Sequence, residues 1–155
     1  FKLRQYGVNG QLLACIRDYL SHRQQSVSVG SAKSLSRPVN AGVPQGSVLG
    51  PLFFFVYVND IIDNLLSISR LVVDDTSLAC SASNFNDIEG IWNHDLDMLY
   101  TWSKQWLVSF NPTNTEAILL SNQNVHTPSL VYDNVNITFV HNHKHLGLIL
   151  NKHGK

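Results

Sequence analysis

The strongest constraint on the fold is an apolar stripe that repeats every three or four residues between positions 85 and 106. Its members are Phe85, Ile88, Trp92, Leu96, Leu99, Trp102 and Trp106. Such spacing places these side chains on one face of an α-helix, where they can be buried together. The segment is therefore predicted to form one long amphipathic helix whose tryptophans lie in the core.

Shorter patterns predict further elements around this helix. Helical spacing predicts a helix over 9–21, and residues that are apolar almost all round predict a second, buried helix over 47–65. The runs 24–30 and 36–42 surround a Gly-Ser-Ala-Lys-Ser turn and predict a hairpin. Strands are also predicted over 71–79 (as a strand, turn, strand unit), 116–121, 136–140 and 145–150. Helices mixed with short antiparallel strands indicate an α+β fold.

Composition sets limits on the class of protein. The length of 155 residues fits one domain or part of one, and a hydrophobic fraction of 44% is enough for a core. The charged fraction of 14% is well below that of ordinary soluble proteins. A shortage of charge indicates surfaces that are covered by something else. Two interpretations remain open: a fragment of a larger protein, and a loosely folded or decayed sequence.

The charges are distributed unevenly along the chain. Residues 1–40 carry six basic side chains against Asp18 alone, a net charge of +5, whereas residues 41–100 have a net charge of −7 and residues 101–155 of +2. A basic segment beside an acidic one fits a protein that holds a phosphate backbone in one place and metal ions in another. Random scatter of surface charge explains the pattern equally well.

The cysteine count and the apolar runs bear on the compartment. Cys15 and Cys80 form no CxxC pair, so we expect no disulfide framework and an intracellular protein of the nucleus or cytoplasm that is not secreted. The first residues lack the apolar core of a signal peptide. The longest apolar stretch, 48–58, is too short to span a membrane, so no membrane partner is expected.

The pair Asp74-Asp75 is the sharpest candidate for chemistry. It stands between the apolar run Leu71-Val72-Val73 and Thr76-Ser77-Leu78. Two adjacent carboxylates repel each other, and partial desolvation by apolar flanks would raise at least one pKa. A hard divalent cation such as Mg²⁺ removes this repulsion, and in nucleotidyl transfer two such ions sit roughly 3.5–4 Å apart. An ordinary Asp-Asp turn explains an isolated pair at least as well.

A second candidate is the loop 41–52, which is rich in glycine and proline and leads into an apolar segment. Glycine lacks a Cβ, so such a loop lets the backbone approach a ligand closely. Gln45 adds an amide donor and acceptor at the tip of the loop. A purely structural turn before a helix is the alternative interpretation.

Several segments together resemble a known family. GVPQGSVLGPLFFFVYVNDI, at 42–61, closely resembles the signature of reverse transcriptases from LINE-type (non-LTR) retrotransposons. LVVDDTSL, at 71–78, is similar to the catalytic Asp-Asp hairpin of that family. The segments WSKQWLVSFNPTNTE, HKHLGLIL and FKLRQYGV resemble three further parts of it, in the correct order. The resemblance thus covers nearly the whole chain.

The resemblance implies a polymerase palm-like subdomain, with helices packed on a small antiparallel sheet. Residues 1–155 would form a partial reverse transcriptase domain. It would run from after the first catalytic aspartate motif to the palm-closing hairpin, without fingers, first catalytic motif or thumb. The intact parent would add deoxynucleotides to a primer 3′ end. Its partners would be an RNA template, a DNA primer, deoxynucleoside triphosphates and the remaining domains of a polyprotein.

The resemblance also implies roles for particular residues. Asp74 and Asp75 would be catalytic and would hold Mg²⁺, with Mn²⁺ as an alternative. The nucleotide and template would contact a set in the 41–52 loop, namely Gly42, Pro44, Gln45, Gly46 and Ser47. The primer end would be gripped at Leu146 and Gly147.

The chain departs from the family pattern at three points. The family has another metal-binding aspartate in a segment before the first residue here, so we expect no polymerisation by this chain alone. Val72 and Val73 stand where the family has an aromatic residue and alanine, and Asn114 stands where it has lysine. These changes favour a decayed copy over tolerated divergence.

Several alternatives stay open. A degenerate, non-catalytic remnant that at most binds nucleic acid is the main rival, and the palm of a viral RNA-dependent RNA polymerase is a weaker one. His141, His143 and His145 alternate, so on a strand they would share a face that could bind zinc, although a solvated hairpin is favoured. The three tryptophans of the apolar stripe could stack on bases, although a core role is favoured.

Overall fold

The predicted long helix is present as α4 (Phe85–Trp106). Asn84 caps its first turn, because the Asn84 side chain accepts a hydrogen bond of 2.9 Å from the backbone N–H of Asp87. The helix ends at Leu107, which adopts the left-handed conformation with φ +54°. The buried side chains include Ile88, Leu96 and Leu99, which confirms the face that the stripe predicts.

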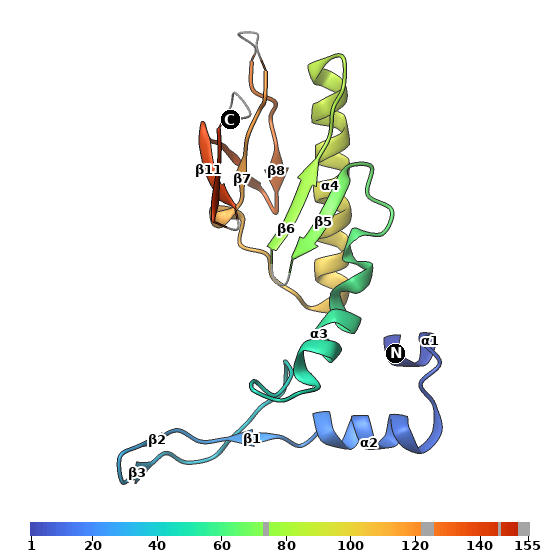
Figure 1. The fold of residues 1–155 in the computed structure, drawn as a ribbon, viewed down its shortest axis with the longest axis vertical. Helices are drawn as coiled ribbons and strands as arrows, with labels where there is room; N and C mark the ends of the chain where they lie inside the picture. Colours follow the sequence, from blue (N-terminus) through green and yellow to red (C-terminus); the bar gives the residue numbers. More distant parts are fainter. Residues whose placement is uncertain (73–74, 122–125, 146, 152–155) are drawn as a thin grey trace. The chain divides into compact units, whose positions relative to one another are not determined.

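The structure is a computed structural model that describes residues 1–72, 75–121, 126–145 and 147–151. It contains two compact units, Phe1–Asp60 and Ile61–Lys155 (Figure 1). Both units mix short strands with helices, so the predicted α+β class is confirmed. None of the described helices is long and apolar enough to cross a membrane.

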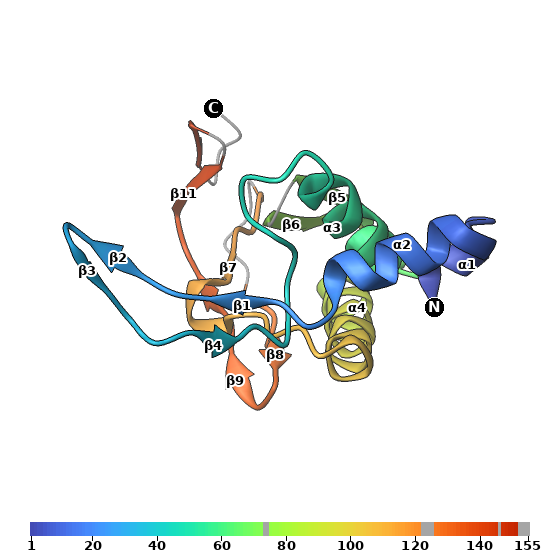
Figure 2. The same ribbon diagram turned by 90° about the horizontal axis from the view of Figure 1, so that it is seen from below.

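The first unit combines helices with a narrow hairpin. Its elements are α1 (Lys2–Gln5), α2 (Gly10–Leu20), β1 (Gln24–Gln25), β2 (Ser28–Val29), β3 (Ala32–Lys33), β4 (Arg37–Pro38), α3 (Gly50–Val58) and the start of η1 (Asn59–Ile62). Strand β1 pairs with β4 and β2 pairs with β3, both antiparallel, which confirms the predicted hairpin. Figure 2 shows the two pairs following one another along one arm.

The apolar helix predicted over 47–65 is shorter and more exposed than expected. Helix α3 begins at Gly50 and ends at Val58, where a 3₁₀ turn continues the chain. Phe53 and Val58 are buried, but Leu52 is 55% exposed and Phe55 is 48% exposed. An all-round apolar helix needs partners on every side, and the described residues cover only part of this one.

The second unit contains α4 and most of the strands. Its other elements are β5 (Ile68–Val72), β6 (Asp75–Ala79), η2 (Pro112–Asn114), β7 (Glu116–Ala117), β8 (Val131–Tyr132), β9 (Val135–Asn136), β10 (Thr138–Phe139), β11 (Asn142–His145) and β12 (Leu148–Asn151). The described strands of the whole chain form six separate two-stranded sheets rather than one small antiparallel sheet. Strands β7 and β10 pair in parallel, contrary to the expected antiparallel arrangement.

The core of this unit lies where α4 meets the strands. Its buried members are Ile61, Leu96, Leu99, Leu130, Tyr132 and Ile137. Trp92 and Trp102 pack against this cluster, which confirms that they belong to the core. Leu71 of β5 and Leu78 of β6 also pack against it. Each such side chain stabilises the fold by roughly 1.5–3 kcal/mol when it is fully buried.

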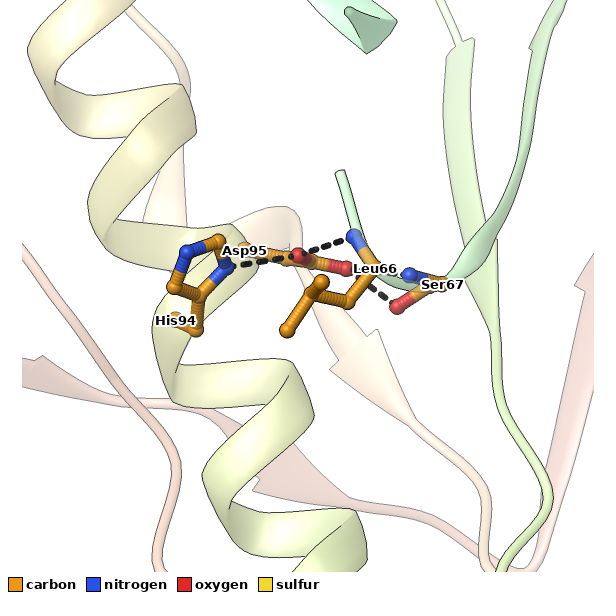
Figure 3. Close-up of polar contacts among 4 residues, drawn as sticks. All are labelled: Leu66, Ser67, His94 and Asp95. Carbon is orange, nitrogen blue, oxygen red and sulfur yellow. Dashed lines mark hydrogen bonds and ion pairs between the residues drawn. The ribbon is translucent and has the colours of Figure 1, made fainter. Parts of the chain in front are cut away.

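A buried carboxylate joins α4 to the segment that enters β5 (Figure 3). Asp95 is completely buried. Its Oδ1 atom accepts a hydrogen bond of 2.8 Å from the Leu66 N–H, and Oδ2 accepts bonds from the Ser67 N–H at 2.9 Å and from the Ser67 hydroxyl. His94 Nδ1 lies 3.1 Å from Oδ1. We call this set of contacts the Asp95 clamp.

The clamp keeps its carboxylate ionised. Burial alone would raise the pKa of Asp95, but the hydrogen bonds from Ser67, Leu66 and His94 stabilise the charge and outweigh burial. The pKa of Asp95 therefore lies below its ordinary value. Since Ser67 directly precedes β5, the clamp fixes the point at which the β5–β6 hairpin leaves α4.

Replacing Asp95 with alanine should destabilise the protein strongly. The change would remove the acceptor of the Leu66 N–H and of the buried Ser67 N–H and hydroxyl, at a cost of roughly 3 kcal/mol in the free energy of unfolding. Urea denaturation followed by tryptophan fluorescence would measure it. The matched control is His94→Ala, because the His94 side chain is 46% exposed and contributes only one of the contacts. An equal effect of both changes would contradict the assigned role.

The clamp also predicts how stability depends on pH. Because the folded-state pKa of Asp95 is lowered, its stabilising contribution is complete above the unfolded-state pKa of about 4. That contribution is lost as the pH falls through the lower folded-state pKa. The unfolding free energy of Asp95→Asn should therefore fall less steeply below about pH 4 than that of the unaltered protein. Urea titrations across the acid range would test this, and identical slopes would contradict it.

Candidate functional site

The predicted catalytic pair falls at the end of the β5–β6 hairpin. Asp75 is the first residue of β6 and pairs with Val72, the last residue of β5. Val73 and Asp74, which come between them in the chain, lie outside the described residues. The strand, turn, strand unit predicted for this segment is thus confirmed at its two strands.

The hairpin has one face on the core and one face that carries Asp75. Leu71 pairs with Thr76, and both lie on the same side as Leu78, which packs against the core. Asp75 and Ser77 therefore lie on the opposite face. The Asp75 side chain is exposed, so the partial desolvation expected from its apolar flanks does not occur there.

This arrangement fits a cation site of a particular kind. Among the residues that the structure describes, no group of three or more His, Cys, Asp or Glu side chains could hold a metal ion. Mg²⁺, however, is usually bound by one or two carboxylates together with waters and substrate phosphates. An exposed carboxylate at the end of an anchored hairpin, with a second aspartate next to it in sequence, suits that mode of binding.

The 41–52 loop is held in shape by its own backbone and by Ser47. The Ser47 hydroxyl donates to the Pro44 carbonyl at 2.7 Å and accepts from the Gly50 N–H at 2.9 Å. A Cβ at Gly50 would lie 2.9 Å from both the Pro44 oxygen and Ser47 Oγ, so only glycine fits. Gly46 has a positive φ of +75° and is exposed beside Gln45 at the tip.

Two basic residues have structural partners that the charge pattern alone did not indicate. Arg23 donates to the Ala41 carbonyl at 3.2 Å and to the Gly42 carbonyl, which ties the start of the loop to the end of α2. Lys2 is buried and donates to the Tyr57 carbonyl and the Asp60 carboxylate. These two cations therefore have structural contacts within the first unit, and a role of the basic segment in phosphate binding stays a prediction.

The loop and the β5–β6 hairpin belong to different compact units. The structure brings Gly42, Pro44, Gln45, Gly46 and Ser47 together in one loop. The joint role of this loop and Asp75 stays a prediction.

The predicted primer-contacting turn joins β11 to β12. His145 pairs with Leu148 across the two strands, and Gly147 has a φ of +88°, a conformation that glycine adopts without strain. Leu146 lies outside the described residues. His143 Nδ1 lies 2.7 Å from Glu116 Oε2, and the His143 and His145 rings stack with centroids 6.1 Å apart. His141 is exposed and precedes the strand, so the predicted three-histidine face contains two histidines.

A shallow groove of about 410 Å³ lies elsewhere in the second unit, between α4 and the β8–β9 hairpin. Its lining includes Asp97, Tyr100 and Asp133 but none of the predicted site residues. Lys104 contacts two of the lining residues, with its ammonium 4.7 Å from the Tyr100 ring centre and 3.7 Å from the Asp133 carboxylate. The groove is thus partly neutralised by the chain itself.

Sequence reasoning missed three residues whose contacts lie at or near the candidate site: Asp95, Arg23 and Ser77. The sequence did offer a sign of the role of Asp95. This residue follows Trp92 by three positions and precedes Leu99 by four, so it is an acid within the apolar stripe of the helix. Arg23 carried no such sign, since its partners are backbone carbonyls of a distant loop. Ser77 Oγ lies 3.4 Å from His145 Nε2, and these two residues are 68 positions apart in the chain. No local pattern could indicate such a contact.

Comparison with known proteins places these observations in context. Over 150 residues, or 92% of the chain, the sequence is 27% identical to the RNA-directed DNA polymerase from mobile element jockey of Drosophila melanogaster. It is 32% identical over 108 residues to the probable RNA-directed DNA polymerase from transposon BS of the same species, and 28% identical over 144 residues to that from transposon X-element.

The alignments include most of this chain but only a small part of each relative. The chain covers 16%, 12% and 16% of the lengths of these three relatives, although the alignments include 92%, 64% and 88% of the chain itself. No protein-family model matches the chain. No solved structure matches it either. The similarity to several such polymerases confirms the resemblance inferred from the motifs: the chain is similar to a segment of RNA-directed DNA polymerases of non-LTR mobile elements.

Proposed function

We propose that the chain is the palm segment of a reverse transcriptase, in which Asp74 and Asp75 hold the divalent cations of nucleotidyl transfer. The observation that carries this proposal is the exposed Asp75 carboxylate at the end of a hairpin anchored on α4. It occurs in a chain that is similar to RNA-directed DNA polymerases over 92% of its length.

The anchoring of the hairpin supports this role. Leu71 and Leu78 pack one face of the hairpin on the core, and the Asp95 clamp fixes the chain at Ser67. A catalytic group must be held within about 0.5 Å of its productive position, and groups on packed elements meet that demand better than groups on loops. The Asp75 carboxylate itself is exposed and therefore open to substrate.

The proposed reaction joins a primer to a deoxynucleotide. The 3′ oxygen of the primer forms a bond to the α-phosphorus, the bond from that phosphorus to the β-phosphate oxygen breaks, pyrophosphate leaves, and the hydroxyl proton passes to solvent. Bound Mg²⁺ would supply charge stabilisation for the attacking and leaving oxygens. Asp74 and Asp75 would hold it, Gln45 and Gly46 would line the pocket for the template base and nucleotide, and Gly147 would form the turn beside the primer end.

A non-catalytic remnant remains the second candidate, and one observation favours it. Asn114 is exposed at the end of η2, where the resembling motif has lysine. A neutral amide there cannot neutralise departing pyrophosphate. A remnant of this kind would keep nucleic-acid contacts without incorporating nucleotides.

Substitution of the aspartate pair separates the two candidates. In the full-length protein, Asp74→Ala and Asp75→Ala should each lower Mg²⁺-dependent incorporation on an RNA template by at least about 100-fold, because the charge that steadies the reacting oxygens is lost. The dissociation constant for primer–template should change little, since phosphate contacts use other residues.

The matched control is Asp97→Ala, which removes an exposed carboxylate from α4 in the same unit. Its incorporation rate should equal that of the unaltered protein. Primer extension and filter binding measure the two quantities. Binding without any incorporation by the unaltered protein would favour the remnant, and an equal loss of binding and incorporation in Asp74→Ala would show that the site is misplaced.

A further inference from the structure

The strand that carries Asp75 makes a side-chain contact with the β11–β12 hairpin. Ser77 follows Asp75 by two residues and lies on the same face of β6. Its Oγ atom is 3.4 Å from His145 Nε2, and His145 is the last residue of β11. We infer that His145 is a positioning residue, which holds β6 and its Asp75 in place through Ser77. This inference rests on the proposed function for its catalytic consequence.

His145 is itself held in a fixed orientation. Its half-buried ring stacks on that of His143 at an interplanar angle of 29°. The Nδ1 atom of His143 in turn lies 2.7 Å from the Oε2 atom of Glu116, a residue of β7. A line of contacts thus runs from Glu116 through His143 and His145 to Ser77. A ring with this support can fix the position of a hydroxyl group that a mobile side chain could not.

Among the described residues, the opposite face of β6 makes no comparable side-chain hydrogen bond. Leu78 contributes apolar packing there. Within the part of the chain that the structure describes, the buried Thr76 hydroxyl has no hydrogen-bond partner. Apolar packing is not directional, whereas a hydrogen bond fixes distance and angle. Besides the backbone pairing of β6 with β5, the Ser77–His145 contact is therefore the directional side-chain contact suited to set the position of this end of the strand.

The chemistry of the contact defines a rescue variant. A serine hydroxyl both donates and accepts, so it can bond to either neutral tautomer of His145. A glutamine side chain also carries both a donor and an acceptor and can replace the ring nitrogen. Leucine keeps apolar volume but makes no hydrogen bond. A difference between His145→Gln and His145→Leu therefore reports the hydrogen bond rather than the packing.

The test uses the full-length protein with Ser77→Ala, His145→Leu, His145→Gln and the double variant of Ser77→Ala with His145→Leu. The matched control is Lys144→Gln, an exposed residue on the other face of β11. Hydrogen–deuterium exchange of the β6 amides reports how firmly the strand is held. Single-turnover incorporation and the primer–template dissociation constant report the catalytic consequence.

The expected results follow from the loss of one hydrogen bond. Exchange in β6 should be about 2–10-fold faster in Ser77→Ala and His145→Leu, and the double variant should be no worse than either single one. His145→Gln and Lys144→Gln should match the unaltered protein. Incorporation should slow by a similar factor in the first two variants, while the primer–template dissociation constant stays the same.

Two results would overturn the inference. One is unchanged exchange in His145→Leu, and the other is an equal effect of His145→Leu and His145→Gln, which would assign the contact to packing alone. A lack of incorporation by the unaltered protein would instead contradict the proposed function. In that case the exchange data alone decide whether His145 holds β6.

Discussion

A single buried charge determines how the second unit is put together. Asp95 lies inside the apolar face of α4, where an ionised carboxylate is stable only if donors surround it. The donors come from Leu66 and Ser67, at the entry to β5, and from His94. Satisfying the charge therefore requires that the β5–β6 hairpin start at one place on the helix. Nonspecific apolar packing of Leu71 and Leu78 could accept several positions, whereas the carboxylate accepts one.

The parts of the fold that the sequence predicted correctly are those set by local periodicity. Helix α4 has a repeated apolar stripe, a capping asparagine and a length of many turns, so its bounds follow from neighbouring residues. The nested β1–β4 and β2–β3 pairs follow from a turn between two extended runs. The parallel pairing of β7 with β10 could not be predicted, because it joins segments of two residues each that are far apart in the chain. Short strands carry too little pattern to specify their partners.

The sequence supplied candidates for the site residues but not for the contacts that support them. The Asp74-Asp75 pair and the 41–52 loop were identified from residue type and spacing, whereas Gly147 was implied only by the family resemblance, with which the comparisons agree. The structural contacts of Lys2 and Arg23 could not be predicted, because a basic residue looks the same in sequence whether it faces solvent or a carbonyl group. The role of Ser77 depends on a histidine 68 residues away. Contacts of that range depend on the packed fold rather than on any local pattern.

Gly50 carries a consequence for how such a sequence drifts. Any side chain there would meet the Pro44 oxygen and the Ser47 hydroxyl at 2.9 Å, so every replacement must push the loop away from the start of α3. Under the proposed function, similar sequences that still encode a working polymerase should keep glycine at this codon, whereas sequences released from selection should accumulate replacements at the neutral mutation rate. The residue found at position 50 thus distinguishes sequences that are still under selection from sequences that are not.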